Sequence, residues 1–202
     1  MMAKRGRPAG FDRSDALDRA MEMFWERGYE GTTLEDLQEA MGNISPTSFY
    51  HAFGSKEALF RLVVEKYRQT VGGPALTALE ESPTAREAVH QMLRLTAESF
   101  CYPGKPHGCM LVLGATNCTP ANAGPQEYLR SIRQQTPTVL RRRLARAVAE
   151  GDLTASADIT SIAAFYATVL HGMAVRAGDG ASKKALMAAV DGAMAAWPAL
   201  TG

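Results

Sequence analysis

Apolar residues recur at helical spacing along most of the chain, and short polar or glycine-rich stretches separate the repeats. In the first repeat, Leu17, Ala20 and Phe24 fall on one face, Asp12 suits the N-cap, and Gly28 suits the stop. No alternation of period two is long enough to form a sheet. The pattern therefore predicts an all-α fold, with a small three-helix domain followed by a larger helical bundle.

Capping residues divide the amino-terminal third into further helices. A second helix is expected from Thr33 to about Gly42, a short third helix after Ser45, and a longer fourth helix after Ser55. The glycines and proline at 72–74 predict a break or a kink. Later helices are expected over residues 84–101, 126–150, 157–177 and 182–197, with a short apolar segment at 109–118.

Composition narrows the class of protein. Of 202 residues, 46% are hydrophobic and 21% are charged, which is typical of a soluble globular protein. The longest apolar run, Cys109–Leu113, is far shorter than the roughly 20 residues that span a bilayer. A cytoplasmic protein without membrane contact is therefore expected. The three cysteines show no C-x-x-C spacing, so we expect no disulfide framework, no metal site and no cofactor.

Two short helices joined by a tight turn at residues 42–44 predict a helix-turn-helix. The second of them begins after Ser45 and carries Thr47 and Ser48, which are short enough to approach base edges in a major groove about 12 Å wide. Tyr50 and His51 extend sideways, at a reach that suits backbone phosphates. This arrangement predicts binding to double-stranded DNA.

Phosphate contacts are also expected outside this short helix. Thr33 and Lys56 lie at the starts of the second and fourth helices, where backbone N–H groups and the helix dipole favour anions. A basic arm precedes the first helix and contains Lys4, Arg5 and Arg7. It either lies along the DNA backbone or in a minor groove, or forms a solvated tail.

Two segments, GYEGTTL at 28–34 and SFYHAFGSKEALF at 48–60, resemble the TetR/AcrR regulators. The resemblance implies a homodimeric, all-α repressor that an unidentified small molecule releases from a palindromic operator. It also implies phosphate contacts by Thr33, Tyr50 and Lys56, and base contacts by Thr47 and Ser48. The turn at 41–45 is one residue longer than the family's usual turn. We expect a DNA-binding domain at 1–54 and a ligand-binding and dimerisation domain at 55–202.

The carboxy-terminal helices are expected to hold the inducer and to form the dimer. Candidate ligand-binding residues are Met92, Phe100, Cys109, Met110, Tyr128, Phe165 and Tyr166. The last two helices combine small residues with large apolar ones, which predicts a four-helix interface across a two-fold axis. The alternative is a monomeric bundle that uses the same residues as its own core.

Cys109 permits a second mode of release. A thiol at a helix start beside Lys105 and His107 would have a lowered pKa and react with electrophiles, whereas the plainer reading is a small buried hydrophobe. A cysteine-nucleophile enzyme is disfavoured, because no acidic residue between Glu98 and Glu127 is available to orient His107. A protein-interaction module is a further alternative, in which the Thr47 and Ser48 face would tolerate bulky substitutions.

Two other features have plain structural interpretations. The basic run at residues 141–143 and 146 is expected to be a solvated helix face rather than a second nucleic-acid site. His171 is expected to be an interior or interface residue rather than a metal ligand.

Overall fold

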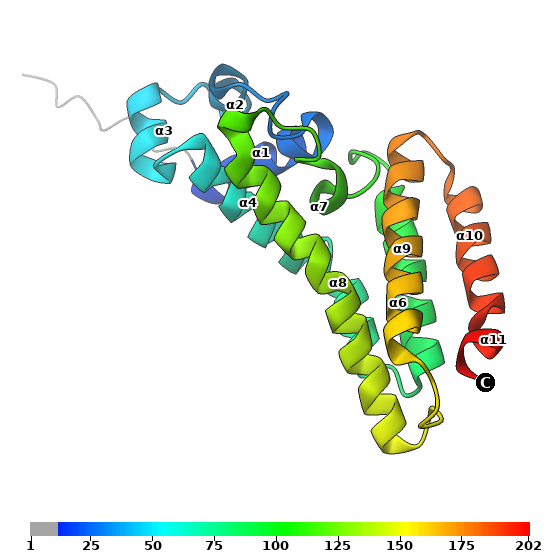
Figure 1. Cartoon of the computed structure of the whole chain (residues 1–202). Coiled ribbons are helices and arrows are strands. Elements are labelled where there is room, and N and C mark those ends of the chain that lie inside the picture. The colour runs from blue at the N-terminus through cyan, green and yellow to red at the C-terminus, as the bar shows by residue number, and fades with distance from the viewer. Residues whose placement is uncertain (1–11) are drawn as a thin grey trace, which may run out of the picture.

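The computed structural model describes residues 12–202, and within that range every regular element is a helix, as the sequence predicts (Figure 1). The elements are α1 (Arg13–Arg27), α2 (Leu34–Ala40), α3 (Pro46–Phe53), α4 (Lys56–Thr70), α5 (Gly73–Glu81), α6 (Ala85–Phe100), α7 (Met110–Leu113), the 3₁₀ turn η1 (Pro120–Asn122), α8 (Ala123–Glu150), α9 (Ile159–Gly178), α10 (Lys183–Ala195) and α11 (Trp197–Thr201). None of these helices is long and apolar enough to cross a membrane.

The first four helices begin where their capping residues predict. The side chain of Asp12 accepts hydrogen bonds from the first turn of α1, while Ser45 and Ser55 cap α3 and α4. Gly28 ends α1 with φ of +69°, a conformation that a residue with a Cβ rarely adopts. Local chemistry therefore fixes the boundaries of the amino-terminal helices.

The break predicted at residues 72–74 is confirmed, because α4 ends at Thr70 and a separate helix, α5, begins at Gly73. The sequence analysis did not predict α5 itself. Pro74 lies in the first turn of α5, where a proline has no intrahelical N–H bond to lose. The last predicted helix, 182–197, corresponds to α10, and the short helix α11 follows it with Pro198 in its first turn. In both places a proline lies in the first turn of a short helix that the sequence did not predict.

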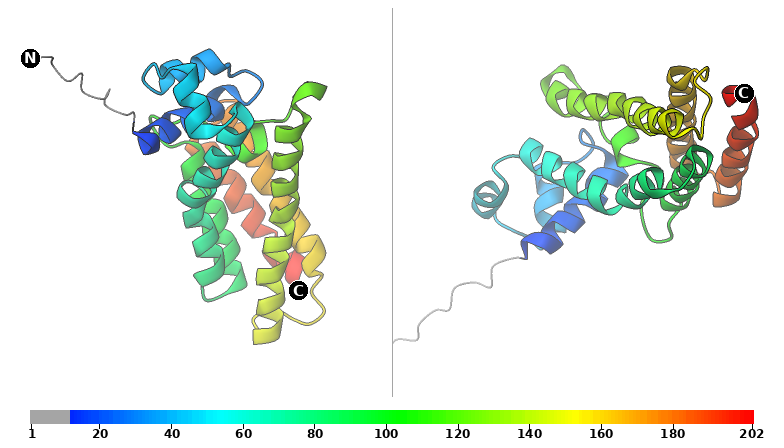
Figure 2. Two further views of the ribbon diagram at one scale, coloured as in Figure 1. Left: turned by 90° about the vertical axis from the view of Figure 1, so that its left-hand side faces the viewer. Right: turned by 90° about the horizontal axis from the view of Figure 1, so that it is seen from below.

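Helices α1, α2 and α3 gather around the amino-terminal end of α4, and α10 lies at the far side of the molecule (Figure 1). The views in Figure 2 show α4, α5 and α8 extending away from this cluster. Aromatic rings fill the junction: Phe60 meets Phe24 and Tyr29 at centroid distances of 5.0 and 5.1 Å, and Trp25 meets Tyr67 at 4.9 Å. The three-helix cluster therefore shares its core with α4.

The expectation that the arginine run on α8 is solvated is wrong for Arg143. Its side chain is buried, and the guanidinium donates from Nε to the Leu79 carbonyl at 3.1 Å and from Nη2 to the Ser82 carbonyl at 3.0 Å. These carbonyls lie at the end of α5, where they lack helical partners. Arg143 therefore caps α5 from α8, while Arg141 and Arg142 remain exposed.

Candidate functional site

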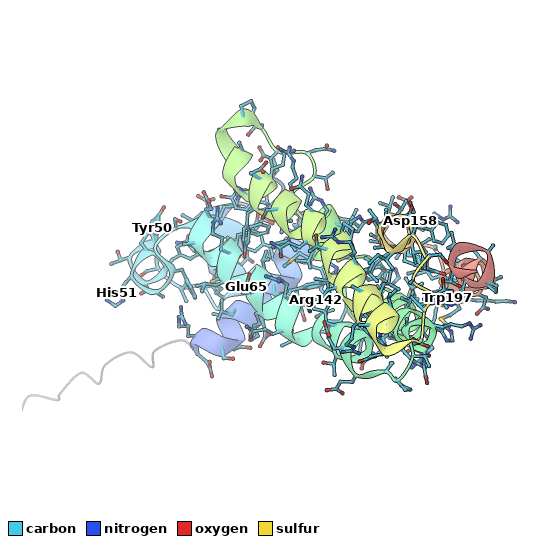
Figure 3. The ribbon with its side chains drawn as sticks, turned by 60° about the horizontal axis from the view of Figure 1, so that its bottom comes forward. Tyr50, His51, Glu65, Arg142, Asp158 and Trp197 are labelled. Atoms are coloured by element: carbon cyan, nitrogen blue, oxygen red, sulfur yellow. The ribbon has the colours of Figure 1, made fainter. Side chains whose placement is uncertain are left out.

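The outer face of α3 is polar and open. Thr47, Ser48, Tyr50 and His51 are exposed, whereas Phe49 turns into the core. Figure 3 shows Tyr50 and His51 at the end of the molecule remote from Trp197. The helix thus presents its short hydroxyl residues and its two larger polar residues away from the bundle, in a form that can enter a groove.

The turn between α2 and α3 uses two left-handed residues. Gly42 has φ of +92° and Asn43 has φ of +58°, and asparagine tolerates this region better than most residues. The Ile44 N–H then donates to the Gln38 carbonyl at 3.2 Å, and the Ile44 side chain is buried. The longer turn is therefore anchored at its end, directly before the α3 cap Ser45.

Thr33 caps α2 in a reciprocal arrangement with Asp36. The Thr33 backbone N–H and hydroxyl donate to Asp36 Oδ2 at 2.9 and 2.7 Å, and the Asp36 N–H donates to Thr33 Oγ1 at 3.1 Å. The two bonds from Thr33 lower the pKa of the Asp36 carboxyl. The start of α2 therefore already binds the Asp36 carboxylate, and the other side of Thr33 is exposed.

Lys56, at the start of α4, lies against an aromatic ring. Its Nζ is 4.2 Å from the centroid of the Tyr29 ring, a cation–π contact. Burial lowers the pKa of Lys56, although the nearby Glu30 carboxylate opposes that shift. The ammonium is thereby held in one place beside the α4 N-terminus, which Ser55 caps through the Ala58 N–H. The arm residues Lys4, Arg5 and Arg7 lie outside the described residues.

A second feature is an interior cavity of about 160 Å³. It is lined mainly by apolar side chains from α4, α5, α6 and α8, with Cys109 and Leu111 from residues 108–122, here called the α7 segment. Of the predicted ligand residues, Met92, Phe100 and Cys109 line it. The sequence reading missed the α4 and α5 wall, including Tyr67 and Leu79, because it treated residues 72–74 as a break.

Four other candidate ligand residues lie elsewhere. Met110 is fully buried beside the cavity wall, and the Tyr166 hydroxyl donates to the Ala193 carbonyl at 3.1 Å. Tyr128 extends from α8 to α4, where its hydroxyl donates to Glu65 Oε1 at 2.6 Å. Burial and this bond raise the pKa of Tyr128 to about 12. Phe165 lies on an outer groove of α9 and α10.

The environment of Cys109 matches the plainer of its two interpretations, a small buried side chain. Burial raises the pKa of the Cys109 thiol, and the hydrogen bond from Tyr67 only partly opposes the shift. Lys105 instead forms an ion pair with Glu22, and His107 is exposed. The alternative, cationic activation by these two residues, is therefore wrong, because Lys105 and His107 lie at the surface while Cys109 lies in the core.

The outward faces of α9 and α10 form a shallow apolar groove, lined by Phe165, Val169, Gly172, Ala189 and Gly192 among others. A Cβ added at either of these glycines would meet no atom within 4 Å. Other large residues that the sequence assigned to this face, including Trp197, are buried within the chain. The exposed groove is therefore made of small side chains with few large ones.

An exposed helix-turn-helix joined to a helical bundle with an interior cavity defines the class of one-component transcriptional regulators. The profile described as "Bacterial regulatory proteins, tetR family" matches residues 16–63. The chain is 34% identical over 197 residues to the HTH-type transcriptional repressor ComR of Escherichia coli K12, covering 97% of this chain and 93% of ComR. This chain belongs to the TetR family of transcriptional regulators.

Further relatives agree with this assignment. The chain is 27% identical to the HTH-type transcriptional repressor BdcR of Escherichia coli K12 over 91% of this chain and 87% of BdcR. Among solved structures, a cysteine mutant of the TetR family regulator CifR, complexed with 26bp double-strand operator DNA, is 44% identical. That match has a TM-score of 0.91 and covers 95% of this chain and 100% of CifR.

Proposed function

We propose that the chain is a homodimeric repressor that binds a palindromic operator through α2, α3 and the start of α4. The exposed polar face of α3, backed by the buried Phe49, is the observation that carries the proposal. The named repressors among its relatives, and the operator complex of CifR, support it. Operator binding would place the protein in the cytoplasm, where bacterial DNA lies.

Each residue of the interface has an expected role. Thr47 and Ser48 would contact base edges, while Tyr50, His51 and Lys56 would contact phosphates. Thr33 would contact a phosphate from its exposed side, and Ser45 would hold the start of α3. Residues 1–54 would form the DNA-binding domain and residues 55–202 the ligand-binding and dimerisation domain. Two copies would set their α3 helices about 34–36 Å apart, one helical turn of DNA.

Release of the operator would begin at the interior cavity. Its volume resembles that of an engineered cavity of roughly 150 Å³ that binds benzene, which suits a small, mostly apolar inducer. Covalent modification of Cys109, which lines the same cavity, is an alternative trigger. The solved operator complexes of CifR are of cysteine mutants, which supports a role for thiols.

The α7 segment, residues 108–122, connects the cavity with the DNA-binding helices. Cys109 lines the cavity, and the same segment binds the end of α1 at two points: the Trp25 indole N–H donates to the Gly108 carbonyl at 3.1 Å, and the Tyr29 N–H donates to the Gly114 carbonyl at 2.6 Å. A ligand that displaces this segment would therefore move the α1–α2 turn and change the spacing of the two α3 helices.

Capture of sheared genomic DNA by the purified full-length protein, followed by sequencing, tests the proposal. We expect enrichment of one or a few palindromic sites. Tyr50→Ala should raise the operator Kd by about tenfold or more, because each copy in the dimer loses one phosphate hydrogen bond. Tyr102→Ala removes an equally exposed tyrosine far from α3 and should leave the Kd unchanged. No enrichment by a folded dimer would contradict the proposal.

A further inference from the structure

An open groove of about 340 Å³ lies between α8 and α9, on a different side of α8 from the interior cavity. Most of its exposed surface is apolar, and its polar side chains are mainly basic: Arg130, Arg133 and Gln134 come from α8, and Thr168 and His171 come from α9. Pro137 and two alanines complete the wall. The groove therefore concentrates hydrogen-bond donors on an otherwise small-residue surface.

The positive charge in this groove is incompletely neutralised. Arg130 pairs with Glu127 at 2.5 Å. Within residues 12–202, neither Arg133 nor His171 forms an ion pair, and the only hydrogen bond of Arg133 runs from Nη1 to the Leu111 carbonyl at 3.0 Å. Burial and the neighbouring Arg130 lower the pKa of Arg133, while burial and Arg133 lower the pKa of His171.

This arrangement costs free energy unless an anion compensates it. A half-buried guanidinium is partly stripped of water, and its remaining N–H groups match the two oxygens of a carboxylate or phosphate. A neutral histidine still donates from one ring nitrogen, whereas the Thr168 hydroxyl already donates to the Ala164 carbonyl at 2.8 Å. Arg133 and His171 come from different helices and line the same groove, so one anion can reach both.

We propose that the groove between α8 and α9 is a second ligand site, which binds a small molecule through its carboxylate or phosphate group. Arg133 is the main anchor, with Arg130 and His171 beside it. Because Arg133 also donates to the Leu111 carbonyl, an anion bound here adjoins the α7 segment, and Leu111 lines the cavity as well. The site is independent of the DNA interface and does not require the operator.

Calorimetric titration of the full-length protein with inorganic phosphate and, separately, with acetate tests this site at constant ionic strength. We expect saturable binding of at least one anion, and the stronger one identifies the preferred group. Arg133→Gln should raise its Kd by about tenfold or more, since a charge-assisted hydrogen bond is lost. Arg141→Gln removes an exposed arginine of the same helix outside the groove and should leave the Kd unchanged.

Thr168→Glu provides a second variant that does not depend on how Arg133→Gln folds. Thr168 is exposed, so a glutamate fits at the surface and its carboxylate can occupy the site from within the chain. This variant should abolish anion binding, and thermal unfolding checks that the chain still folds. The absence of binding to the wild-type protein, or binding that survives both substitutions, would overturn the proposal.

Discussion

The substitution Gly192→Leu distinguishes a dimer built on the α9–α10 groove from a monomeric bundle. It should stabilise a monomeric bundle but weaken such a dimer. Gly192 is exposed in the interior of α10, and an added Cβ meets nothing within 4 Å in the single chain. In a monomer, replacing a helical glycine by a good helix former should raise the free energy of unfolding by about 1 kcal/mol. The melting temperature would then rise by about 2–4 °C for a chain of this size.

In a dimer that uses this groove, the same substitution inserts a bulky side chain between closely packed helices. Overpacking costs about 1–3 kcal/mol per site, and a two-fold interface contains each site twice. The combined cost of about 2–6 kcal/mol would raise the dimer Kd between about thirty-fold and about twenty-thousand-fold. Gly172→Leu, on the neighbouring helix and also open in the single chain, should act in the same direction.

Sedimentation over a concentration series measures the dimer Kd, and thermal unfolding measures stability. Ala145→Leu places the same side chain on the exposed face of α8 and should leave the Kd unchanged. If Gly192→Leu and Gly172→Leu both keep the wild-type Kd, the groove is not the interface. A wild-type chain that sediments at 21.8 kDa at micromolar concentration would refute the dimer itself.

Three further outcomes follow from buried polar groups. Arg143→Ala should lower the free energy of unfolding by about 3 kcal/mol, measured in urea, because two carbonyls of α5 lose a charged donor; Arg141→Ala should change it by less than about 0.5 kcal/mol. His171 has a folded-state pKa below the unfolded value of about 6.5, so its unfolded form takes up more protons and stability falls as the pH drops through that value. His171→Gln should reduce the fall in melting temperature between about pH 7.5 and 5.5. Burial raises the pKa of all three thiols, but only Cys109 is buried while Cys101 and Cys118 are half-buried, so mass spectrometry should find that iodoacetamide labels Cys109 last. If modification of Cys109 releases the operator, release should occur only in this slow phase of labelling.

The sequence predicted the amino-terminal helices well because their boundaries depend on neighbouring residues. Asp12, Ser45 and Ser55 each satisfy backbone N–H groups within their own first turn, so no distant contact is needed. The exposed polar face of α3 follows from the same local periodicity. These are the parts of the candidate interface that a single sequence can specify.

The cavity and the buried arginine depend instead on how distant helices cross. Arg143 looks like part of a solvated run until α8 packs against α5 and brings two unpaired carbonyls within reach. Tyr67 and Leu79 become cavity residues only because α5 folds back against α6. Helical periodicity marks which residues are apolar, but it does not state which helix each apolar face will meet.

The tight contact between the α7 segment and the end of α1 explains how a small cavity can influence a distant surface. A Cβ at Gly28 would lie 3.1 Å from the Gly114 carbonyl oxygen, so the two backbones touch without intervening side chains. Beyond that point, Thr119 and Asn122 donate to the two oxygens of Glu30 at 2.8 and 2.7 Å. Glu30 lies only three residues before the α2 cap Thr33, and the ring of the neighbouring Tyr29 makes the cation–π contact with Lys56.

A shift of the α7 segment would therefore pass through direct contacts, without a flexible linker, to Thr33 and Lys56, two of the proposed phosphate contacts. Coupling still requires an inducer that binds the shifted state more tightly than the operator-bound one. The packing would supply the mechanical connection, and the chemistry lining the cavity would select the inducer.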